Sequence, residues 1–170
     1  MVVQPLGVGK RLNYQVMAMP ISKPAKRIHS LVLSSPEAMQ GWGKQLARLL
    51  KPGDTLALIG ELGSGKTTLV QGIASGWGYT RRANSPTFAL ANEYETPRGV
   101  IYHMDMYRLS KRELPVFPLE DYWGQGLCLI EWADRVRDRL PSSTLEVRLK
   151  IAGPQKRNLT LIHPKRHRAS

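Results

Sequence analysis

Short apolar runs separated by polar and glycine-rich turns recur along most of the chain. Such a run between turn residues is typical of a β-strand. On this pattern we expect strands at residues 28–33, 55–59, 88–94, 100–105, 127–131, 145–151 and 157–162. Because only a short turn at 97–99 separates the third expected strand from the fourth, these two are predicted to form an antiparallel hairpin.

Apolar residues also recur at helical spacing in two longer stretches. The first begins after the sequence Ser35-Pro36, in which serine is a preferred helix cap and proline fits the first turn, and it ends at Pro52-Gly53. The second begins near Gly65. The apolar positions are Met39, Trp42, Leu46 and Leu49 in the first helix, and Leu69, Val70, Ile73, Ala74 and Trp77 in the second. Shorter helices are expected within 110–123 and at 133–140.

The formal net charge of +12 over 170 residues lies mainly at the two ends of the chain. Residues 1–30 contain five basic and no acidic residues, and residues 150–170 contain six basic and no acidic residues. We therefore divide the chain into a basic arm (1–26), one domain (27–162) and a basic tail (163–170). Solvated chain ends account for this charge; contact with RNA or an acidic partner is the alternative, and a transit peptide is a further alternative for the arm.

Membrane insertion and secretion are not expected from the sequence. No apolar run approaches the ~18 residues that cross a bilayer, and no apolar segment directly follows Lys10 and Arg11 as in a secretory signal. The single cysteine, Cys128, rules out an internal disulfide and is expected to pack in an apolar run. A reducing, cytoplasmic location fits these features.

The sequence from Gly60 to Thr67 matches the phosphate-binding loop G-x-x-x-x-G-K-[ST] in full, between an expected strand and an expected helix. Backbone N–H groups of such a loop hold phosphate oxygens, the lysine adds a positive charge, and the threonine hydroxyl can bind Mg²⁺. We therefore expect ATP and Mg²⁺ as cofactors. The residues assigned to the nucleotide here are Gly60, Glu61, Leu62, Gly63, Ser64, Gly65, Lys66, Thr67 and Thr68. The fold class that follows is a three-layer α/β phosphate-loop domain with a mixed sheet, whose antiparallel strands lie to one side.

Two carboxylates, Asp105 and Glu131, stand at the ends of apolar strands, where α/β sheets bind their ligands. Together with Lys66 they are the catalytic candidates, and together with Thr67 they are the candidate Mg²⁺ ligands. His103 lies on the same strand face as Asp105 and is expected to be a packing histidine rather than a catalytic one. Trp132 either stacks on the nucleotide base or packs.

Several further motifs stand in a distinctive order with this loop. They are Ser85-Pro86-Thr87, Asn92-Glu93-Tyr94, the run from Tyr102 to Leu109, and Ile130-Glu131-Trp132. With these motifs, residues 31–150 resemble the bacterial ATPase family of tRNA threonylcarbamoyladenosine biosynthesis (TsaE type).

The resemblance implies a partner-dependent ATPase that does not itself transfer the threonylcarbamoyl group. It implies that the chain joins the transferase subunit and its paralogue partner, and so acts on tRNA indirectly. Direct contact with tRNA through the basic ends, which lie outside the resemblance, is the alternative that their charge leaves open. It further implies that Thr67 and Glu131 bind Mg²⁺, that Asp105 is a further site acid, and that residues 85–87, with Ser85 and Thr87, form a switch-like loop near the γ-phosphate.

Two other classes of protein compete with this interpretation. A small-molecule kinase would use the same loop but needs a lid that often carries arginines. The arginines between Thr87 and Leu127 are instead scattered. An RNA-binding module could use the basic ends, but the chain has no aromatic-rich RNA motif and the phosphate loop would have no role.

Overall fold

The computed structural model describes residues 28–86 and 88–164. The predicted arm (1–26), Thr87 and residues 165–170 of the predicted tail lie outside these ranges. The elements are β1 (Ile28–Leu33), α1 (Pro36–Ala47), β2 (Thr55–Ile59), α2 (Lys66–Gly76), β3 (Ala91–Thr96), β4 (Gly99–Asp105), β5 (Leu127–Glu131), β6 (Leu145–Ile151) and β7 (Arg157–Ile162), with short 3-10 helices η1 (Leu114–Val116), η2 (Leu119–Tyr122) and η3 (Ala133–Arg139).

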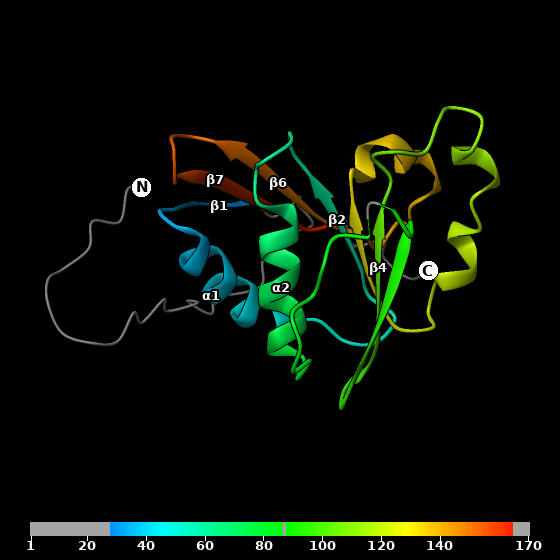
Figure 1. Cartoon of the computed structure of the whole chain (residues 1–170), viewed down its shortest axis with the longest axis horizontal. Coiled ribbons are helices and arrows are strands. Elements are labelled where there is room, and N and C mark those ends of the chain that lie inside the picture. Colours follow the sequence, from blue (N-terminus) through cyan, green and yellow to red (C-terminus); the bar gives the residue numbers. More distant parts are fainter. Residues whose placement is uncertain (1–27, 87, 165–170) are drawn as a thin grey trace, which may run out of the picture.

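The seven strands form one mixed sheet in the order β1-β7-β6-β2-β5-β4-β3 (Figure 1). The central strands β6, β2, β5 and β4 are parallel, whereas β3 pairs with β4, and β7 pairs with both β6 and β1, in antiparallel fashion. The mixed sheet is confirmed, and so is the antiparallel pairing of the third and fourth strands, which as β3 and β4 form a hairpin over residues 91–105. The expectation that antiparallel strands lie to one side is wrong, because the short turn after β6, closed by the Ala152 N–H and the Lys156 carbonyl, makes a second hairpin at the other margin.

Two hydrophobic clusters lie on opposite faces of the sheet. On one face α1 and α2 pack side by side against Leu56, Leu58 and Leu129 (Figure 1). On the other face the segment from Met106 through η2, and then η3, covers residues such as Met104 and Ile130 of the central strands. The three predicted layers are therefore present, although the third consists of loops and 3-10 helices.

The first helix ends earlier than its apolar spacing suggests. Ser35 caps α1 by accepting a hydrogen bond from the Ala38 N–H, as expected. The helix ends at Ala47, and the Arg98 guanidinium donates to the Ala47 and Leu50 carbonyls at 2.7 and 2.6 Å. Leu49, expected as an apolar position of this helix, lies beyond its end and is 66% exposed.

The strand expected at residues 88–94 begins only at Ala91. Residues 88–90 form a turn in which the Leu90 N–H donates to the Pro86 carbonyl and Leu90 has a φ of 65°. Phe88 is 85% exposed. Apolar composition alone therefore extended this strand prediction too far toward the N-terminus.

Cys128 lies fully buried in β5. Burial raises the pKa of its thiol to about 12, since a thiolate would lose its hydration there. The residue packs, as predicted. Over the described ranges, no helix is long and apolar enough to cross a membrane.

Glycines allow α1 and α2 to approach closely. A Cβ atom added at Gly72 would lie 2.4 Å from the Gln40 carbonyl oxygen, and one at Gly43 would lie 2.8 Å from the Leu69 carbonyl oxygen. Backbone atoms cannot yield as a flexible side chain can. The crossing of the helices, and with it the position of the phosphate loop at the start of α2, depends on these two residues.

We expect Gly72→Ala to lower the free energy of unfolding by about 1–3 kcal/mol through overpacking at this crossing. Gly41 provides the control, because it lies in α1, the helix against which Gly72 of α2 packs, and a Cβ at Gly41 meets nothing within 4 Å. Gly41→Ala should raise stability by about 0.5–1 kcal/mol, since alanine is the better helix former. Urea unfolding of both variants measures the difference; equal effects would contradict the proposed role of the crossing.

Candidate functional site

A cleft of about 400 Å³ opens beside the phosphate loop, at the C-terminal ends of β4 and β5. This edge of a parallel sheet is where α/β proteins bind ligands. Its lining residues are Leu62, Gly63, Gly65, Lys66, Thr67, Thr68, Ser85, Asp105, Tyr107, Arg108, Glu131 and Trp132. Most of the residues assigned from the sequence thus meet at one place. Gly60, Glu61 and Ser64 belong to the loop without lining the cleft, and Thr87 is outside the described residues.

The backbone geometry of the loop explains why three of its positions are glycine. Gly63 and Gly65 have φ angles of 76° and 99°, which other residues rarely adopt. A Cβ at Gly60 would lie 2.6 Å from the Leu149 carbonyl oxygen. Gly65 caps α2 without a side chain, so the first N–H groups of the helix face the cleft unobstructed.

Lys66 is 4% exposed, and its ammonium group folds back onto the loop. Nζ donates to the Gly60 and Glu61 carbonyls at 2.7 and 3.0 Å, and lies 4.0 Å from the centre of the Trp132 ring. Burial lowers the pKa of Lys66, while the nearby carboxylates, Glu131 foremost, oppose that shift. An anion in the cleft would compensate this buried charge.

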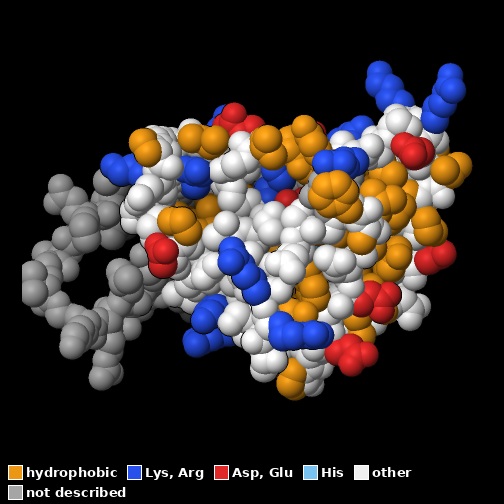
Figure 2. Space-filling model, viewed as in Figure 1, with side chains coloured by type: hydrophobic (Ala, Val, Ile, Leu, Met, Phe, Trp, Pro, Cys, Tyr) orange, Lys and Arg blue, Asp and Glu red, His pale blue; other side chains and the backbone are white. Residues whose placement is uncertain are grey.

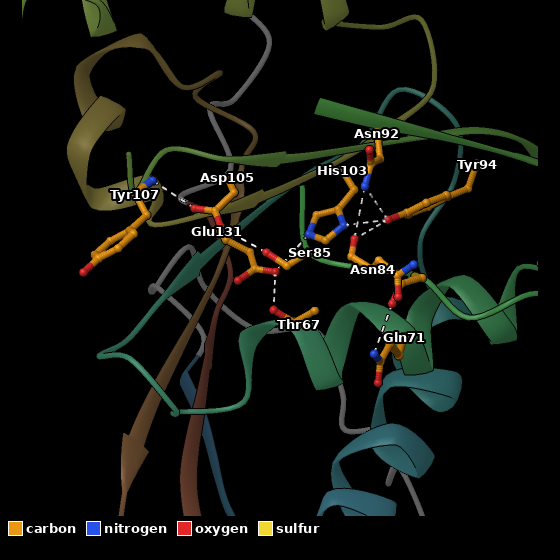
Figure 3. Close-up of polar contacts among 11 residues, drawn as sticks. Thr67, Gln71, Asn84, Ser85, Asn92, Tyr94, His103, Asp105, Tyr107 and Glu131 are labelled. Carbon is orange, nitrogen blue, oxygen red and sulfur yellow. Dashed lines mark hydrogen bonds and ion pairs between the residues drawn. The ribbon is translucent and has the colours of Figure 1, made fainter. Parts of the chain in front are cut away.

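Thr67 and Glu131 come from different elements and meet in the cleft. The Thr67 hydroxyl at the start of α2 donates to Oε1 of Glu131, at the end of β5, at 2.8 Å. The same oxygen lies 2.9 Å from Nε2 of His103. Figure 3 shows the three side chains pointing toward one another. His103 is fully buried and both its ring nitrogens are bonded, as expected of a packing histidine.

Asp105 lies directly beside Glu131 in the register of β4 and β5. Its Oδ1 accepts from the Tyr107 backbone N–H at 2.9 Å, and its Oδ2 accepts from the Ser85 hydroxyl at 3.2 Å. It is 4% exposed. These bonds hold the carboxylate in a fixed direction and tie it to the 83–86 segment.

The other wall of the cleft was only partly foreseen from the sequence. Trp132, with a φ of 56°, packs against Tyr107 with ring centres 4.8 Å apart and ring planes tilted by 33°. The Arg135 guanidinium donates to the carbonyls of Met106, Tyr107 and Leu109 and so fixes the segment that carries Tyr107. Neither Tyr107 nor Arg135 matches a catalytic pattern. Tyr107 belongs to the motif from Tyr102 to Leu109, whereas the sequence signal for Arg135 is its position close after the strand-end acid Glu131.

The donor set fits Mg²⁺ only in combination with a phosphate ligand. The described part of the chain contains no group of three or more His, Cys, Asp or Glu side chains able to hold a metal ion. A hydroxyl from Thr67 and carboxylates from Glu131 and Asp105 are hard oxygen donors of the kind Mg²⁺ takes alongside water and substrate phosphates. The arrangement suits a metal brought in with a nucleotide rather than a permanently bound one.

Comparison with known proteins agrees with this geometry. The family model "Threonylcarbamoyl adenosine biosynthesis protein TsaE" matches residues 33–159, a range that contains the whole cleft. The chain belongs to the TsaE family. A Bacillus subtilis member is 42% identical over 126 residues, which cover 74% of this chain and 80% of that protein. A Synechocystis member is 43% identical over 110 residues, covering 62% and 69%.

The fold comparison points to the same family. The crystal structure of Bacillus subtilis YdiB superposes with a TM-score of 0.71 at 35% identity, covering 82% of this chain and 88% of that one. Both the resemblance seen in the sequence and the predicted fold class are thereby confirmed. The family is one of tRNA threonylcarbamoyladenosine biosynthesis.

Proposed function

We propose that this chain is the ATP-hydrolysing subunit of tRNA threonylcarbamoyladenosine biosynthesis, and that it works together with the transferase subunit and its paralogue partner. The observation that carries this proposal is the meeting of the Thr67 hydroxyl and the Glu131 carboxylate at 2.8 Å, beside Lys66 and an open helix N-terminus. A phosphate loop alone binds nucleotide, whereas hydrolysis needs acids placed around it.

Each residue receives a role from its contacts. Backbone N–H groups of residues 61–67 would bind the phosphates of a bound nucleotide, and the Lys66 ammonium, which here donates to the loop carbonyls, would supply positive charge to the β- and γ-phosphates. Oε1 of Glu131 accepts two hydrogen bonds, so we assign Oε2 to the cation, together with the Thr67 oxygen. Bound Mg²⁺ would neutralise charge on the phosphates. Asp105, held by Ser85 and Tyr107, orients a water molecule.

The kinase alternative is less well supported. Arg98, one of the scattered arginines, binds carbonyls at the C-terminal end of α1. Among the described residues, Arg108 is the one arginine that lines the cleft. Its guanidinium lies 4.2 Å from the centre of the Phe88 ring. This arrangement does not resemble an arginine-bearing lid. An RNA-binding module without catalysis would have no use for the Thr67–Glu131 pair.

Partner dependence is supported by the mouth of the cleft. Leu62 is 73% exposed, Phe88 85% and Tyr107 47%, although each is apolar or aromatic. Figure 2 shows hydrophobic side chains gathered in the half of the molecule that carries β4, with lysines and arginines scattered over the same face. Exposed apolar groups around a cleft are typical of a surface that another protein covers.

The two basic ends belong to the same part of the sheet. Ile28 at the start of β1 pairs with Ile162 at the end of β7, so the chain enters and leaves the sheet side by side. The basic residues that precede β1 and follow β7 are the groups that we propose for contact with tRNA phosphates. A cytoplasmic location follows from this role and stays a prediction.

The proposal is tested by ADP release. Alone, the chain should hydrolyse ATP slowly, and the transferase pair should accelerate release, because such sites are often completed in trans. Lys66→Ala should abolish the acceleration and weaken ATP binding by at least about tenfold, as expected for a lost charge-assisted contact. ADP release that responds to a metabolite and not to the transferase pair would favour a kinase.

The two acids should differ in their dependence on Mg²⁺. Glu131→Gln and Asp105→Asn both preserve shape and should preserve the fold. Each should lower partner-stimulated hydrolysis by at least about tenfold, with smaller losses of ATP affinity than Lys66→Ala. Glu131→Gln should shift the Mg²⁺ titration further than Asp105→Asn does. Wild-type hydrolysis by Glu131→Gln would remove Glu131 from the cation site.

Deletion of residues 1–26 and 165–170 tests the basic ends. We expect the shortened chain to fold and bind ATP normally, while the complex binds tRNA more weakly, most clearly at low salt, because salt screens exposed charges. Filter binding at 50 and 200 mM salt measures this. Equal tRNA affinity for both chains at low salt would show that these residues do not contact tRNA.

A further inference from the structure

A chain of hydrogen bonds runs from the cation-site carboxylate to the backbone of Asn84 (Figure 3). Oε1 of Glu131 lies 2.9 Å from Nε2 of His103, and Nδ1 of His103 lies 3.0 Å from the Tyr94 hydroxyl. That hydroxyl lies 2.7 Å from the Asn84 carbonyl oxygen. Three strands and one loop contribute to the chain, which therefore depends on the tertiary fold.

The residues of this hydrogen-bond chain are shielded from solvent. His103 is 0% exposed, Glu131 3% and Tyr94 4%. The Tyr94 ring is further held against Tyr79, with ring centres 4.7 Å apart. Buried polar groups linked in this way have few alternative partners, so each member restricts the orientation of the next.

The positions of the protons determine which atom donates and which accepts in each of these hydrogen bonds. A carboxylate only accepts hydrogen bonds, so the imidazole proton that faces Glu131 is on Nε2, and Nδ1 faces the tyrosine hydroxyl as an acceptor. The single hydroxyl proton of Tyr94 then faces two acceptors, the Asn84 carbonyl oxygen at 2.7 Å and Nδ1 of His103 at 3.0 Å, and is shared between them in a three-centre hydrogen bond. Burial raises the pKa of Tyr94, which keeps that proton in place.

The far end of the chain belongs to a segment that is itself anchored at the cleft. Gln71 of α2 donates to the Ala83 carbonyl at 3.0 Å, and Asn92 donates to the Asn84 carbonyl at 3.2 Å. The next residue, Ser85, lines the cleft and donates to Asp105. The segment 83–86 is thus joined to one acid directly and to the other through Tyr94 and His103.

We propose that Tyr94 is a positioning residue, which through His103 orients the Glu131 carboxylate and couples it to the 83–86 segment. The inference rests on the proposed function, since it concerns the residue assigned there to the cation. Simple packing would require only the rings of Tyr94 and His103. The continuous hydrogen bonding, from a cleft acid to a cleft-lining segment, gives the hydroxyl a role of its own. In metal sites such outer partners orient the ligand and tune its affinity.

Tyr94→Phe removes the hydroxyl and keeps the ring. Tyr79→Phe is the matched control, because it removes the same group from the neighbouring ring, which takes no part in the chain of hydrogen bonds. Two quantities are measured in each full-length variant: ATP affinity without metal, by calorimetry, and Mn²⁺ affinity of the ATP-bound protein, by electron paramagnetic resonance. We expect Tyr94→Phe to weaken Mn²⁺ binding about threefold to tenfold, as for the loss of one hydrogen bond, with metal-free ATP affinity unchanged. Tyr79→Phe should leave both unchanged.

A double-mutant cycle then separates orientation of Glu131 from general loosening of the fold. If Tyr94 acts through Glu131, Tyr94→Phe should have no further effect on Mn²⁺ affinity in the Glu131→Gln background. An equal loss in both backgrounds, or equal behaviour of Tyr94→Phe and Tyr79→Phe, would overturn the inference. Failure of the wild-type chain to bind ATP with Mn²⁺ would instead overturn the proposed function.

A measurement on the wild-type chain does not depend on the variants. The ¹⁵N chemical shifts of His103 report which ring nitrogen carries the proton. A proton on Nε2 with Nδ1 accepting supports the proposed chain of hydrogen bonds. A neutral ring protonated on Nδ1 alone would overturn it, since Nε2 could then not donate to the carboxylate.

Discussion

Burial of several charged groups at one point is the constraint on which the cleft depends. Lys66, Asp105 and Glu131 are each less than 5% exposed, and a charge removed from water is costly unless it is paired and hydrogen-bonded. The structure meets this requirement with partners from distant segments: loop carbonyls for Lys66, Ser85 and the Tyr107 backbone for Asp105, and Thr67 and His103 for Glu131. These hydrogen bonds therefore fix the positions of the loops around the cleft as well as the orientations of the buried carboxylates.

The parallel centre of the sheet explains why these groups meet. Strands β4 and β5 run in the same direction as β2, so Asp105, Glu131 and the loop after β2 emerge at one edge. The face beneath is filled by α2, whose position is fixed by its glycine contact with α1. A change at the helix crossing would therefore move Thr67 relative to Glu131, although Gly72 is not among the residues that line the cleft.

The sequence predicted best those parts whose patterns are local. The strands at 55–59 and 127–131 read as apolar runs because parallel central strands are buried on both faces, and the phosphate loop carries its own signature. Leu49 lies beyond the end of the helix, where the distant residue Arg98 binds the Ala47 and Leu50 carbonyls, a contact that helical spacing in the sequence does not show. The hairpin at the β6–β7 margin needed strand pairing, which apolar patterning does not encode. The link from Tyr94 to Glu131 depends on both strand register and side-chain rotamers, so no spacing rule could have predicted it.

Trp132 illustrates how the site departs from local preference. A residue with a side chain in the left-handed region costs about 1 kcal/mol or more, and glycine would adopt the observed φ of 56° without that cost. Glycine, however, would remove the indole whose ring centre lies 4.0 Å from the Lys66 ammonium and which packs against Tyr107. A buried cation with two carbonyl partners gains further stabilisation from an aromatic face. The conformation of Trp132 is thus unfavourable for the backbone and favourable for the cleft. Contact with the Lys66 ammonium, rather than the geometry of the turn after β5, explains why tryptophan stands at this position.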